Sequence, residues 1–298
     1  MSNDKALVTL LLGESYQAIW ERHVRRGWQA YAERHGYDLI VLTEPLVDSD
    51  RPPHWQKLLV PSLDALQAYD FIVWIDSDVQ INFRTAPCIV SQMRSDKIGG
   101  VDVSFFTHDE VEGISVAERY GRLVKARSAA VAGSEPAGED PLRDMDPTSF
   151  RLDAIYAEDG FTDATDRYIN GGVLVLQPRR HAALLTGIYA AYAQTSAHYE
   201  NTCLSYELLK IDYVEFLDPR FNFPWVYDIT RHYPFLWHRY LRDGDLYDDI
   251  IRACVNTAHM NNWFLHFAGA NSLMKGALKL VDHDIASALD VRLDPPQR

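Results

Sequence analysis

Two carboxylates separated by one residue, in the triplet Asp76-Ser77-Asp78, are the side chains of this chain whose spacing best suits chemistry. They directly follow the apolar run Phe71–Ile75, which is short, β-branched and aromatic and therefore predicts a buried parallel strand. The carboxyl end of such a strand faces the crevice in which open α/β sheets bind ligands. Two carboxylates this close repel each other unless a cation neutralises them, and oxygen ligands suit Mn²⁺ or Mg²⁺ bound to substrate phosphates. The triplet therefore predicts a site for a metal ion and a diphosphate.

A D-x-D triplet also has a plain structural explanation. Acidic pairs are common on solvated loops, and Ser77 and Asp78 could simply cap a turn after the strand. The triplet gains weight only from the elements that position it.

An alternating series of strands and helices leads up to the triplet. We expect strands at 6–12, 37–42 and 71–75 and helices at 16–35 and 55–68. Gly36 fits the end of the first helix, and Pro61 predicts a break or a late start in the second. This order favours a fold of the α/β class, with a mostly parallel central sheet flanked by helices.

The rest of the chain continues the pattern after an interruption. We expect further strands at 98–106, 168–176, 213–217 and 263–267 and helices at 114–131, 179–195, 200–210 and 277–289. The character of the chain changes between His108 and Tyr168, where a Gly- and Pro-containing loop at 133–141 precedes a polar, Asp-rich stretch at 142–167. We predict one domain over residues 1–298, in which about 108–167 is an inserted helical and loop segment serving as a lid or an acceptor-specific region.

The overall composition excludes some classes of partner. The chain has 298 residues, 47% hydrophobic, and a net charge of −13, which argues against binding to a nucleic-acid backbone. Its three cysteines, Cys88, Cys203 and Cys254, are far apart and form no C-x-x-C pair, so neither a disulfide framework nor a zinc site is expected.

The cysteine pattern and the lack of targeting signals indicate a compartment. The apolar segment 6–12 stops at Gly13, is too short to span a bilayer and lacks a small-residue cleavage site, so we predict a core strand there. We expect a cytoplasmic protein with no transmembrane segment, which could still act at the periphery of a membrane.

Four sequence features in a fixed order suggest a family. They are Asp76-Ser77-Asp78, Asn170-Gly171-Gly172, Arg220-Phe221-Asn222-Phe223 and His266-Phe267-Ala268-Gly269. Together they resemble the nucleotide-sugar-dependent glycosyltransferases of the GT-A fold, above all the retaining glycogenin and bacterial lipopolysaccharide galactosyltransferase family. A second likeness is to the fungal and plant Golgi α-galactosyl/mannosyltransferases and xyloglucan xylosyltransferases. The resemblance covers roughly residues 5–105 and 168–270.

The resemblance implies a set of metal ligands. Asp76 would contact the nucleotide ribose and the metal, Asp78 would be the main carboxylate ligand, and His266 would be the third ligand. Two carboxylates and a neutral imidazole form a plausible manganese set. The alternative for His266 is a packed core histidine, because Phe264 and Phe267 flank it.

The resemblance also places residues around the donor. The donor-binding set comprises Lys57, Asp76, Ser77, Asn170, Gly171, Gly172, Gly269 and Lys275. The glycines of Asn170-Gly171-Gly172 would permit positive φ and a close approach of backbone to ligand, although an ordinary Asn-Gly turn into a strand explains them equally well.

Two positions depart from the family. Glu200 and Asn201 stand where the family carries an acidic residue and a glutamine; Glu200 would hold a donor-sugar hydroxyl and Asn201 would lie near the anomeric carbon. Glu207 is the alternative to Glu200, and a solvated helix face is the ordinary place for either. The family's diphosphate-binding lysine is replaced by Ser272, which leaves Lys57 or Lys275 to neutralise the diphosphate.

The implied activity is metal-dependent transfer of a sugar from a nucleoside diphosphate donor, with UDP as the expected nucleotide, to a hydroxyl of a glycan, glycolipid or small-molecule acceptor. It is a hexosyltransferase reaction, and the resemblance implies retention. Two alternatives remain open. One is a sugar-nucleotide pyrophosphorylase, for which the single Gly13 after the first strand is a poor phosphate loop. The other is a non-catalytic nucleotide-sugar-binding scaffold of the same fold, because fold alone does not imply chemistry.

Overall fold

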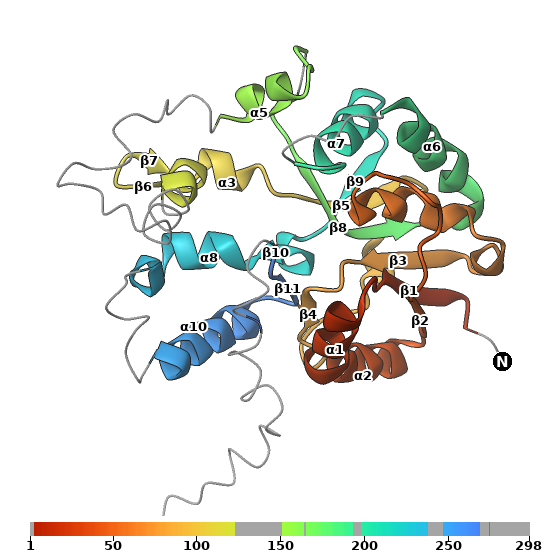
Figure 1. Cartoon of the computed structure of the whole chain (residues 1–298), viewed down its shortest axis with the longest axis horizontal. Helices are drawn as coiled ribbons and strands as arrows, with labels where there is room; N and C mark the ends of the chain where they lie inside the picture. The colour runs from red at the N-terminus through yellow and green to blue at the C-terminus, as the bar shows by residue number, and fades with distance from the viewer. Residues whose placement is uncertain are drawn as a thin grey trace, which may run out of the picture.

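A six-stranded sheet forms the centre of the molecule (Figure 1). The computed structural model describes residues 3–122, 151–163, 165–192, 198–237, 247–268 and 274. The sheet has the strand order β2-β1-β3-β8-β5-β9. Its strands are β1 (Lys5–Leu10), β2 (Asp38–Leu42), β3 (Phe71–Ile75), β5 (Ile98–Asp102), β8 (Ile169–Leu176) and β9 (Val214–Phe216). All except β8 run in one direction, so the predicted α/β class with a mostly parallel sheet is confirmed.

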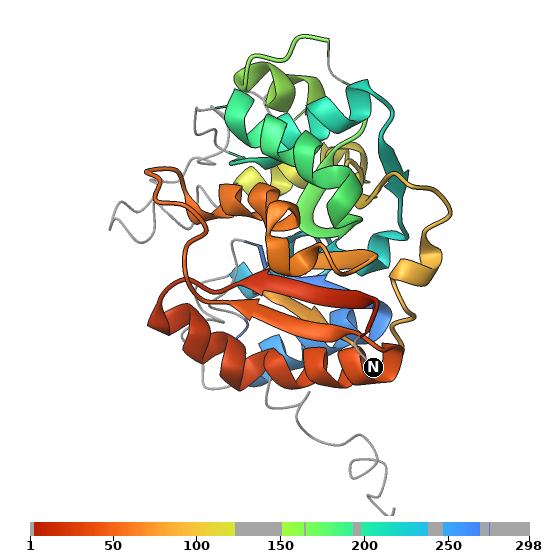
Figure 2. The same cartoon turned by 90° about the vertical axis from the view of Figure 1, so that its right-hand side faces the viewer.

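Helices cover both faces of this sheet. The α-helices that the structure describes in full are α1 (Glu14–His23), α2 (Arg25–His35), α3 (Phe105–His108), α5 (Leu152–Glu158), α6 (Pro178–Ala191), α7 (Asn201–Lys210), α8 (Trp225–Arg231) and α10 (Tyr247–Asn261). The 3₁₀ helices are η1 (Pro53–Ser62), η2 (Asp64–Leu66), η3 (Val90–Gln92), η5 (Pro219–Phe221) and η6 (Pro234–Trp237). Figure 2 shows α1 and α2 against one face of the sheet and η1 with α6 against the other.

The alternation of side chains along each strand creates two cores. In β3, Val73 and Ile75 pack with Trp20 and Trp28 of α1 and α2. Ile72 and Trp74 of the same strand pack on the opposite face, with residues of η1, α6 and α7. Successive residues of a strand point to opposite faces, so an unbroken apolar run is what a strand covered on both sides requires.

Two predicted helices differ from the observed ones. The single helix expected at 16–35 breaks at Val24 into α1 and α2, and α2 ends as predicted at Gly36, which has a left-handed conformation with φ 68°. Residues expected as a helix at 55–68 form the 3₁₀ helices η1 and η2 instead. Pro61 lies inside η1 and has no N–H to donate, so a regular α-helix cannot continue through it.

A second, three-stranded sheet was not predicted as a unit. It consists of β10 (Phe223–Pro224), β11 (Phe264–His266) and β4 (Val79–Ile81), in that order. Only β11 falls in an expected strand, at 263–267. Figure 1 shows this sheet between the central sheet and the helices α8 and α10.

The region between β5 and β8 is described in part. Strand β5 ends at Asp102, earlier than the predicted 106, because the Asp102 carboxylate accepts the backbone N–H of Ser104 at 2.9 Å and the chain turns into α3. A hairpin of β6 (Glu110–Val111) and β7 (Ile114–Ser115) follows, and residues 116–122 are helical. The loop predicted at 133–141, the remainder of the helix predicted at 114–131 and the helix predicted at 277–289 lie outside the described residues.

Candidate functional site

The two carboxylates of the acidic triplet and a distant histidine meet at the carboxyl end of β3. One ligand atom from each of Asp76, Asp78 and His266 lies within 4.8 Å of the others. His266 is 3% exposed, and its Nε2 lies 3.2 Å from Oδ1 of Asp78. Residues almost two hundred positions apart in the chain thus form one cluster of oxygen and imidazole ligands.

The small sheet creates this contact. Strand β4 begins directly after Asp78 and pairs antiparallel with β11, so that Val79 lies opposite His266. The backbone N–H of Phe267 donates to the carbonyl oxygen of Asp78 at 3.0 Å. The register of a short ladder therefore fixes the imidazole beside the triplet.

Asn222 determines which nitrogen of His266 faces the carboxylates. Its Nδ2 donates to the carbonyl and side-chain oxygens of Asn170 at 3.0 and 3.1 Å, so its Oδ1 remains an acceptor. Nδ1 of His266 lies 2.8 Å from that Oδ1 and therefore carries the proton that it donates. In the neutral ring Nε2 then presents its lone pair to Asp78, which is the tautomer that a metal ligand needs.

The ionisation of the pair fits a cation site. Burial alone would lower the pKa of His266, but the Asp78 carboxylate raises it above its ordinary value. Burial alone would raise the pKa of Asp78, but His266 holds it below its ordinary value. The cluster thus favours positive charge between the two groups, and a divalent cation can replace the proton there. Two carboxylates and an imidazole suit Mn²⁺ or Mg²⁺ chemically.

Gly172 gives the imidazole its space. A Cβ atom at this position would lie 2.3 Å from Cε1 and 2.6 Å from Nδ1 of His266. Asn170, Gly171 and Gly172 lie inside β8 and do not form a turn that precedes it, and neither glycine has positive φ. The close approach observed here is to His266, whereas the predicted approach of the backbone to a ligand stays a prediction, and the φ argument for these glycines was wrong.

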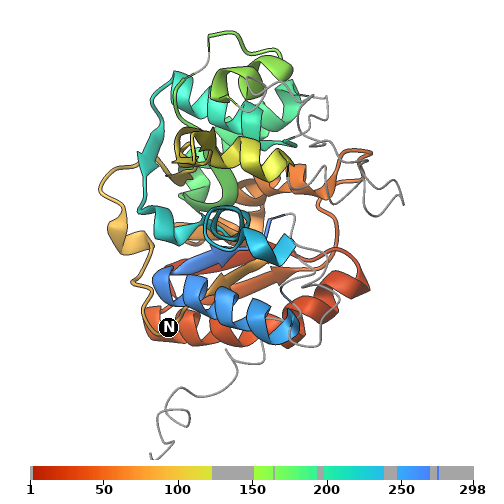
Figure 3. The ribbon, with the colours of Figure 1, turned by 90° about the vertical axis from the view of Figure 1, so that its left-hand side faces the viewer.

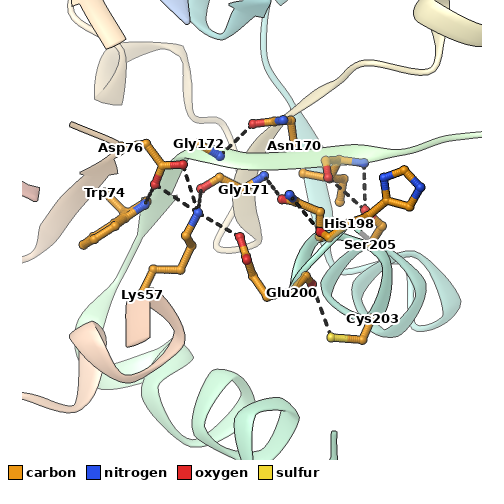
Figure 4. Close-up of polar contacts among 12 residues, drawn as sticks. Lys57, Trp74, Asp76, Asn170, Gly171, Gly172, His198, Glu200, Cys203 and Ser205 are labelled. Atoms are coloured by element: carbon orange, nitrogen blue, oxygen red, sulfur yellow. Dashed lines mark hydrogen bonds and ion pairs between the residues drawn. The ribbon is translucent and has the colours of Figure 1, made fainter. Parts of the chain in front are cut away.

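A buried ion-pair network supports the other carboxylate of the triplet (Figure 4). The ammonium group of Lys57, which is 3% exposed, lies 2.9 Å from Asp76 and 2.8 Å from Glu200, and it donates to the Gly171 carbonyl at 3.3 Å. Burial alone would lower the pKa of Lys57, but Asp76 and Glu200 raise it above its ordinary value. The indole N–H of Trp74 also donates to Asp76 at 2.8 Å. These contacts fix the orientation of Asp76.

Glu200 pairs with the Lys57 side chain of η1, and Asn201 supports the backbone of β8. Glu200 is 1% exposed, and its Oε2 has no hydrogen-bond donor among the described residues. Asn201 accepts the backbone N–H of Gly171 at 2.7 Å. Glu207, the alternative to Glu200, accepts a hydrogen bond from Tyr192. Of the two candidate glutamates, Glu200 is therefore the one linked to the cluster, because it shares Lys57 with Asp76.

A cavity of about 230 Å³ adjoins the triplet. It reaches from Asp76, Ser77 and Asp78 to the end of β1 and the start of η1. The other lining residues are Leu10, Leu12, Tyr16, Pro53, His54, Lys57 and Trp74. A lining that combines carboxylates with apolar and aromatic side chains suits a ligand with a charged part and a flat part.

The remaining predicted residues fall elsewhere. Gly269 and Lys275, with Ser272, lie outside the described residues. Neither Asn222 nor Trp74 was predicted as a site residue, although Asn222 belongs to one of the four sequence features that suggest the family. The signal for Asn222 was available in principle, because a histidine ligand needs a partner for its second nitrogen.

Within the part of the chain that the structure describes, no helix has the length and apolar character needed to cross a membrane. No protein-family model matches the sequence, and no curated protein matches it.

Comparison with solved structures returns glycosyltransferases. One is a glycosyltransferase involved in the glycosylation of the major capsid of PBCV-1, at 14% identity and a TM-score of 0.47, over 91% of this chain and 98% of that chain. The apo bifunctional glycosyltransferase WbbM is similar at 14% identity and a TM-score of 0.45, over 90% of this chain and 46% of that chain. GlyE of Streptococcus pneumoniae TIGR4 follows at 13% identity and a TM-score of 0.41, over 88% and 54%.

The chain thus spans about half the length of the second and third of these proteins. All three are glycosyltransferases, the class that the sequence resembles, and they distinguish no subfamily. Because each TM-score is below 0.5, the case for a function rests on the geometry of the site.

Proposed function

We propose that this protein is a metal-dependent glycosyltransferase that moves a sugar from a nucleoside diphosphate donor, with UDP as the nucleotide, to an acceptor hydroxyl. The observation that carries the proposal is the cluster of Asp76, Asp78 and His266 at the carboxyl end of β3, beside a cavity of about 230 Å³. Carboxylate and imidazole ligands next to a ligand cavity at this edge of an α/β sheet are suited to a cation that accompanies a diphosphate.

The cavity supports a division of the donor into two parts. Asp76, Ser77 and Asp78 of its lining would face the diphosphate, and Leu12, Tyr16 and His54 would face the base. Tyr16 is 52% exposed and therefore has a ring face available for stacking.

The chain's own side chains would prepare the site for the departure of a charged diphosphate. Asp78, Asp76 and Nε2 of His266 would hold the cation, which when bound supplies positive charge against the leaving group. Lys57 keeps Asp76 in one orientation, and Asn222 holds a proton on Nδ1 of His266, so that Nε2 is the nitrogen available to a cation. Preorganised ligands of this kind need no rearrangement as charge develops.

The acceptor and the stereochemistry complete the proposal. Residues 108–167 would contribute to acceptor binding, in a single domain with the donor site. Hexosyl transfer with retention follows from the resemblance to glycogenin-like enzymes, in which a leaving phosphate oxygen can take the acceptor proton without a separate base. Asn170, Gly171 and Gly172 would line the donor sugar, with Glu200 and Asn201 behind them, and Gly269 and Lys275 would approach the diphosphate.

The test is a screen of nucleoside diphosphate sugars with and without Mn²⁺. We expect release of UDP from a UDP-sugar that requires Mn²⁺ or Mg²⁺. Asp78→Asn and His266→Ala should lower this turnover at least about 100-fold, because they remove cation ligands. His232→Ala is the matched control. His232 is an exposed histidine directly after α8, so this variant should retain turnover.

Other outcomes identify the alternatives. Donor binding without turnover for any acceptor tested would indicate a scaffold. Turnover only with pyrophosphate would indicate a pyrophosphorylase. Full Mn²⁺-dependent activity in Asp78→Asn would remove the proposed site.

A further inference from the structure

A second cavity lies where α1 ends and α2 begins, and it shares no lining residue with the cavity beside the acidic triplet, here called the donor cavity. Its volume is about 40 Å³, and it is lined by Arg22, His23, Val24, Arg26, Gly27, Gln80, Ile81, Phe83, Arg84 and His259. The cavity thus joins α1, α2, β4 and α10. Figure 3 shows α10 on the same side of the molecule as α1 and α2. Tyr16 of the donor cavity and His23 of this one lie on the same helix, seven residues or about 10 Å apart along its axis at 1.5 Å per residue.

Two buried side chains that line this cavity lack hydrogen-bond partners. Gln80 is 3% exposed, and neither Oε1 nor Nε2 has a partner among the described residues. His259 is 7% exposed, and its Nδ1 likewise has none there. An unpaired buried amide costs about 1–3 kcal/mol, so a residue that keeps one next to a cavity suggests a ligand that completes it.

The surroundings of the cavity are cationic. Among the described residues that line it there are three arginines and no acidic residue, in a chain of net charge −13. The pKa of His259 is lowered to about 4, first by burial and then by the guanidinium group of Arg84. Arg84 is in turn held by Arg34, which donates to the carbonyl oxygens of Phe83 and Arg84 at 2.8 and 2.6 Å.

The start of α2 adds to this positive field. Helix α2 has eleven residues, no side-chain cap at its N-terminus and no acidic residue in its first turn. Val24, Arg26 and Gly27 of that turn line the cavity. The N-terminus of a helix carries a partial positive charge, which favours an anion. The N–H groups of Val24 and Gly27 donate to the carbonyl oxygens of Trp20 and Val24, so the side chains must supply most of the donors.

We propose that this cavity binds a phosphate group. Gln80 Nε2, the first turn of α2 and the guanidinium groups at the rim would donate to its oxygens. Gln80 Oε1 would accept the P–OH of the monoprotonated form, which is abundant near pH 6 because the second pKa of a phosphate monoester is about 6. The volume equals that of about three water positions at 10–15 Å³ each, which suits one tetrahedral oxyanion and excludes a nucleotide.

Binding here would act on the element that carries the metal ligands. Gln80 lies two residues after Asp78 in β4 and pairs with Leu265, the neighbour of His266, in β11. His259 lies in α10, which leads into β11. A phosphate that joins α2, β4 and α10 would therefore stiffen the ladder that holds His266 beside Asp78.

Thermal unfolding at pH 6 in EDTA, with inorganic phosphate against chloride at equal ionic strength, tests the proposal. We expect saturable stabilisation of about 2–4 °C. Gln80→Leu should fold, because it replaces an unpaired amide with an apolar group of similar size, and it should lose the response. Arg26→Gln should lose it as well. Arg25→Gln is the matched control, since Arg25 pairs with Glu21 at 2.7 Å outside the cavity, and it should keep the response.

Further measurements locate the phosphate. Asp78→Asn should keep the response; if it is lost there, phosphate binds in the donor cavity and the proposal fails. Sulfate has the same shape without an O–H at this pH, so it should stabilise less; an equal effect would overturn the role of Gln80 Oε1. No response in the wild type, or the same response in Gln80→Leu and Arg26→Gln, would overturn the site altogether.

The source of the phosphate is decided by a third comparison. Glycerol 3-phosphate represents a soluble phosphate monoester, and phosphatidylcholine vesicles with and without phosphatidic acid represent a lipid headgroup. Stabilisation by glycerol 3-phosphate that depends on Gln80 and Arg26 would support the site and identify a soluble ligand. Co-sedimentation with the acidic vesicles that depends on the same two residues would support the site and identify a lipid headgroup. If neither glycerol 3-phosphate stabilises the protein nor the acidic vesicles bind it, the ligand is not a phosphate monoester.

Discussion

The two carboxylates of the acidic triplet are supported in different ways. Asp76 belongs to a network of full charges, with Lys57 between Asp76 and Glu200, on the η1 face of the central sheet. Asp78 faces a chain of hydrogen bonds that runs from His266 through Asn222 to Asn170, in and around the small sheet. Only one residue separates the two arrangements in sequence.

The difference shows which part of the site is coupled to folding. Removing one member of a buried charge network leaves other charges buried and unpaired, which destabilises the whole domain. Removing one member of the His266 chain changes the position and tautomer of a ligand, with less effect on the charge balance. We therefore expect variants on the Lys57 side to lose stability, and variants on the His266 side to lose cation affinity.

The largest expected effect is that of Lys57→Met. It leaves Asp76 and Glu200 without their common cation and should lower the free energy of unfolding by about 3–5 kcal/mol in a denaturant titration. Lys97→Met is the matched control, because Lys97 forms an exposed pair with Asp212 and its loss should cost less than about 1 kcal/mol. Equal losses of stability in Lys57→Met and Lys97→Met would show that the Lys57 network stabilises the fold no more than an exposed ion pair does.

Gly172→Ala should come next. The added Cβ would lie 2.3 Å from the imidazole of His266, so the ring must move, with a cost of about 1–3 kcal/mol in stability and a weakened response to Mn²⁺. Calorimetric titration with Mn²⁺ and thermal unfolding measure the two effects. Gly187→Ala in α6, where an added Cβ meets nothing within 4 Å, should leave both unchanged or slightly raise stability.

Asn222→Leu addresses the hydrogen-bond chain alone. Nδ1 of His266 would lose its acceptor, so Nε2 would no longer be fixed as the free nitrogen, and the dissociation constant for Mn²⁺ should rise about 10–100-fold. Titration calorimetry is the readout. An unchanged dissociation constant would show that Asn222 does not orient the ligand.

Asp228→Asn sharpens the comparison with a buried carboxylate that has no strong cationic partner. Its nearest basic side chain among the described residues is that of His232, with Nε2 at 3.8 Å, and burial raises the pKa of Asp228 to about 6. Between the ordinary value of 3.8 and about 6, the folded state binds more protons than the unfolded state, so stability falls as pH rises through this window.

The variant should remove that slope and be about 1–2 kcal/mol more stable than the wild type at pH 7. Denaturant titrations at several values from pH 4 to pH 7 measure it. If the free energies of unfolding of the wild type and Asp228→Asn change in parallel over this pH range, the pKa of Asp228 is not raised.

The sequence predicted the parts of the fold that have a strong local signal. The apolar run Phe71–Ile75 is buried from both faces, and Gly36 ends α2 with positive φ, so each carries its own evidence. The break at Val24 was missed because the apolar spacing continues across it. The strands β4 and β10 were missed because two or three residues have no measurable periodicity, and only their pairing partners define them.

The same reasoning separates what was foreseen in the site from what was not. The proximity of Asp76, Asp78 and His266 was predicted from a resemblance and is present in the structure. The pairing of Lys57 with Asp76 and Glu200 was not predicted, because a buried salt bridge between distant segments leaves no pattern in one sequence. The same holds for the Gln80 and His259 side chains, whose unpaired atoms can be identified only once their neighbours are known.

The reversed direction of β8 has a consequence for how this protein could diversify. Because β8 runs against β3 and β5, the end of β5 at Asp102 and the start of β8 at Ile169 lie opposite each other, on the edge that carries the acidic triplet. The chain leaves the scaffold and rejoins it at almost the same place. An insertion between these two points can grow, shrink or be exchanged without disturbing the strands beneath it. New substrate specificities could therefore arise by replacement of the segment between Asp102 and Ile169, while the strands and the acidic triplet stay unchanged.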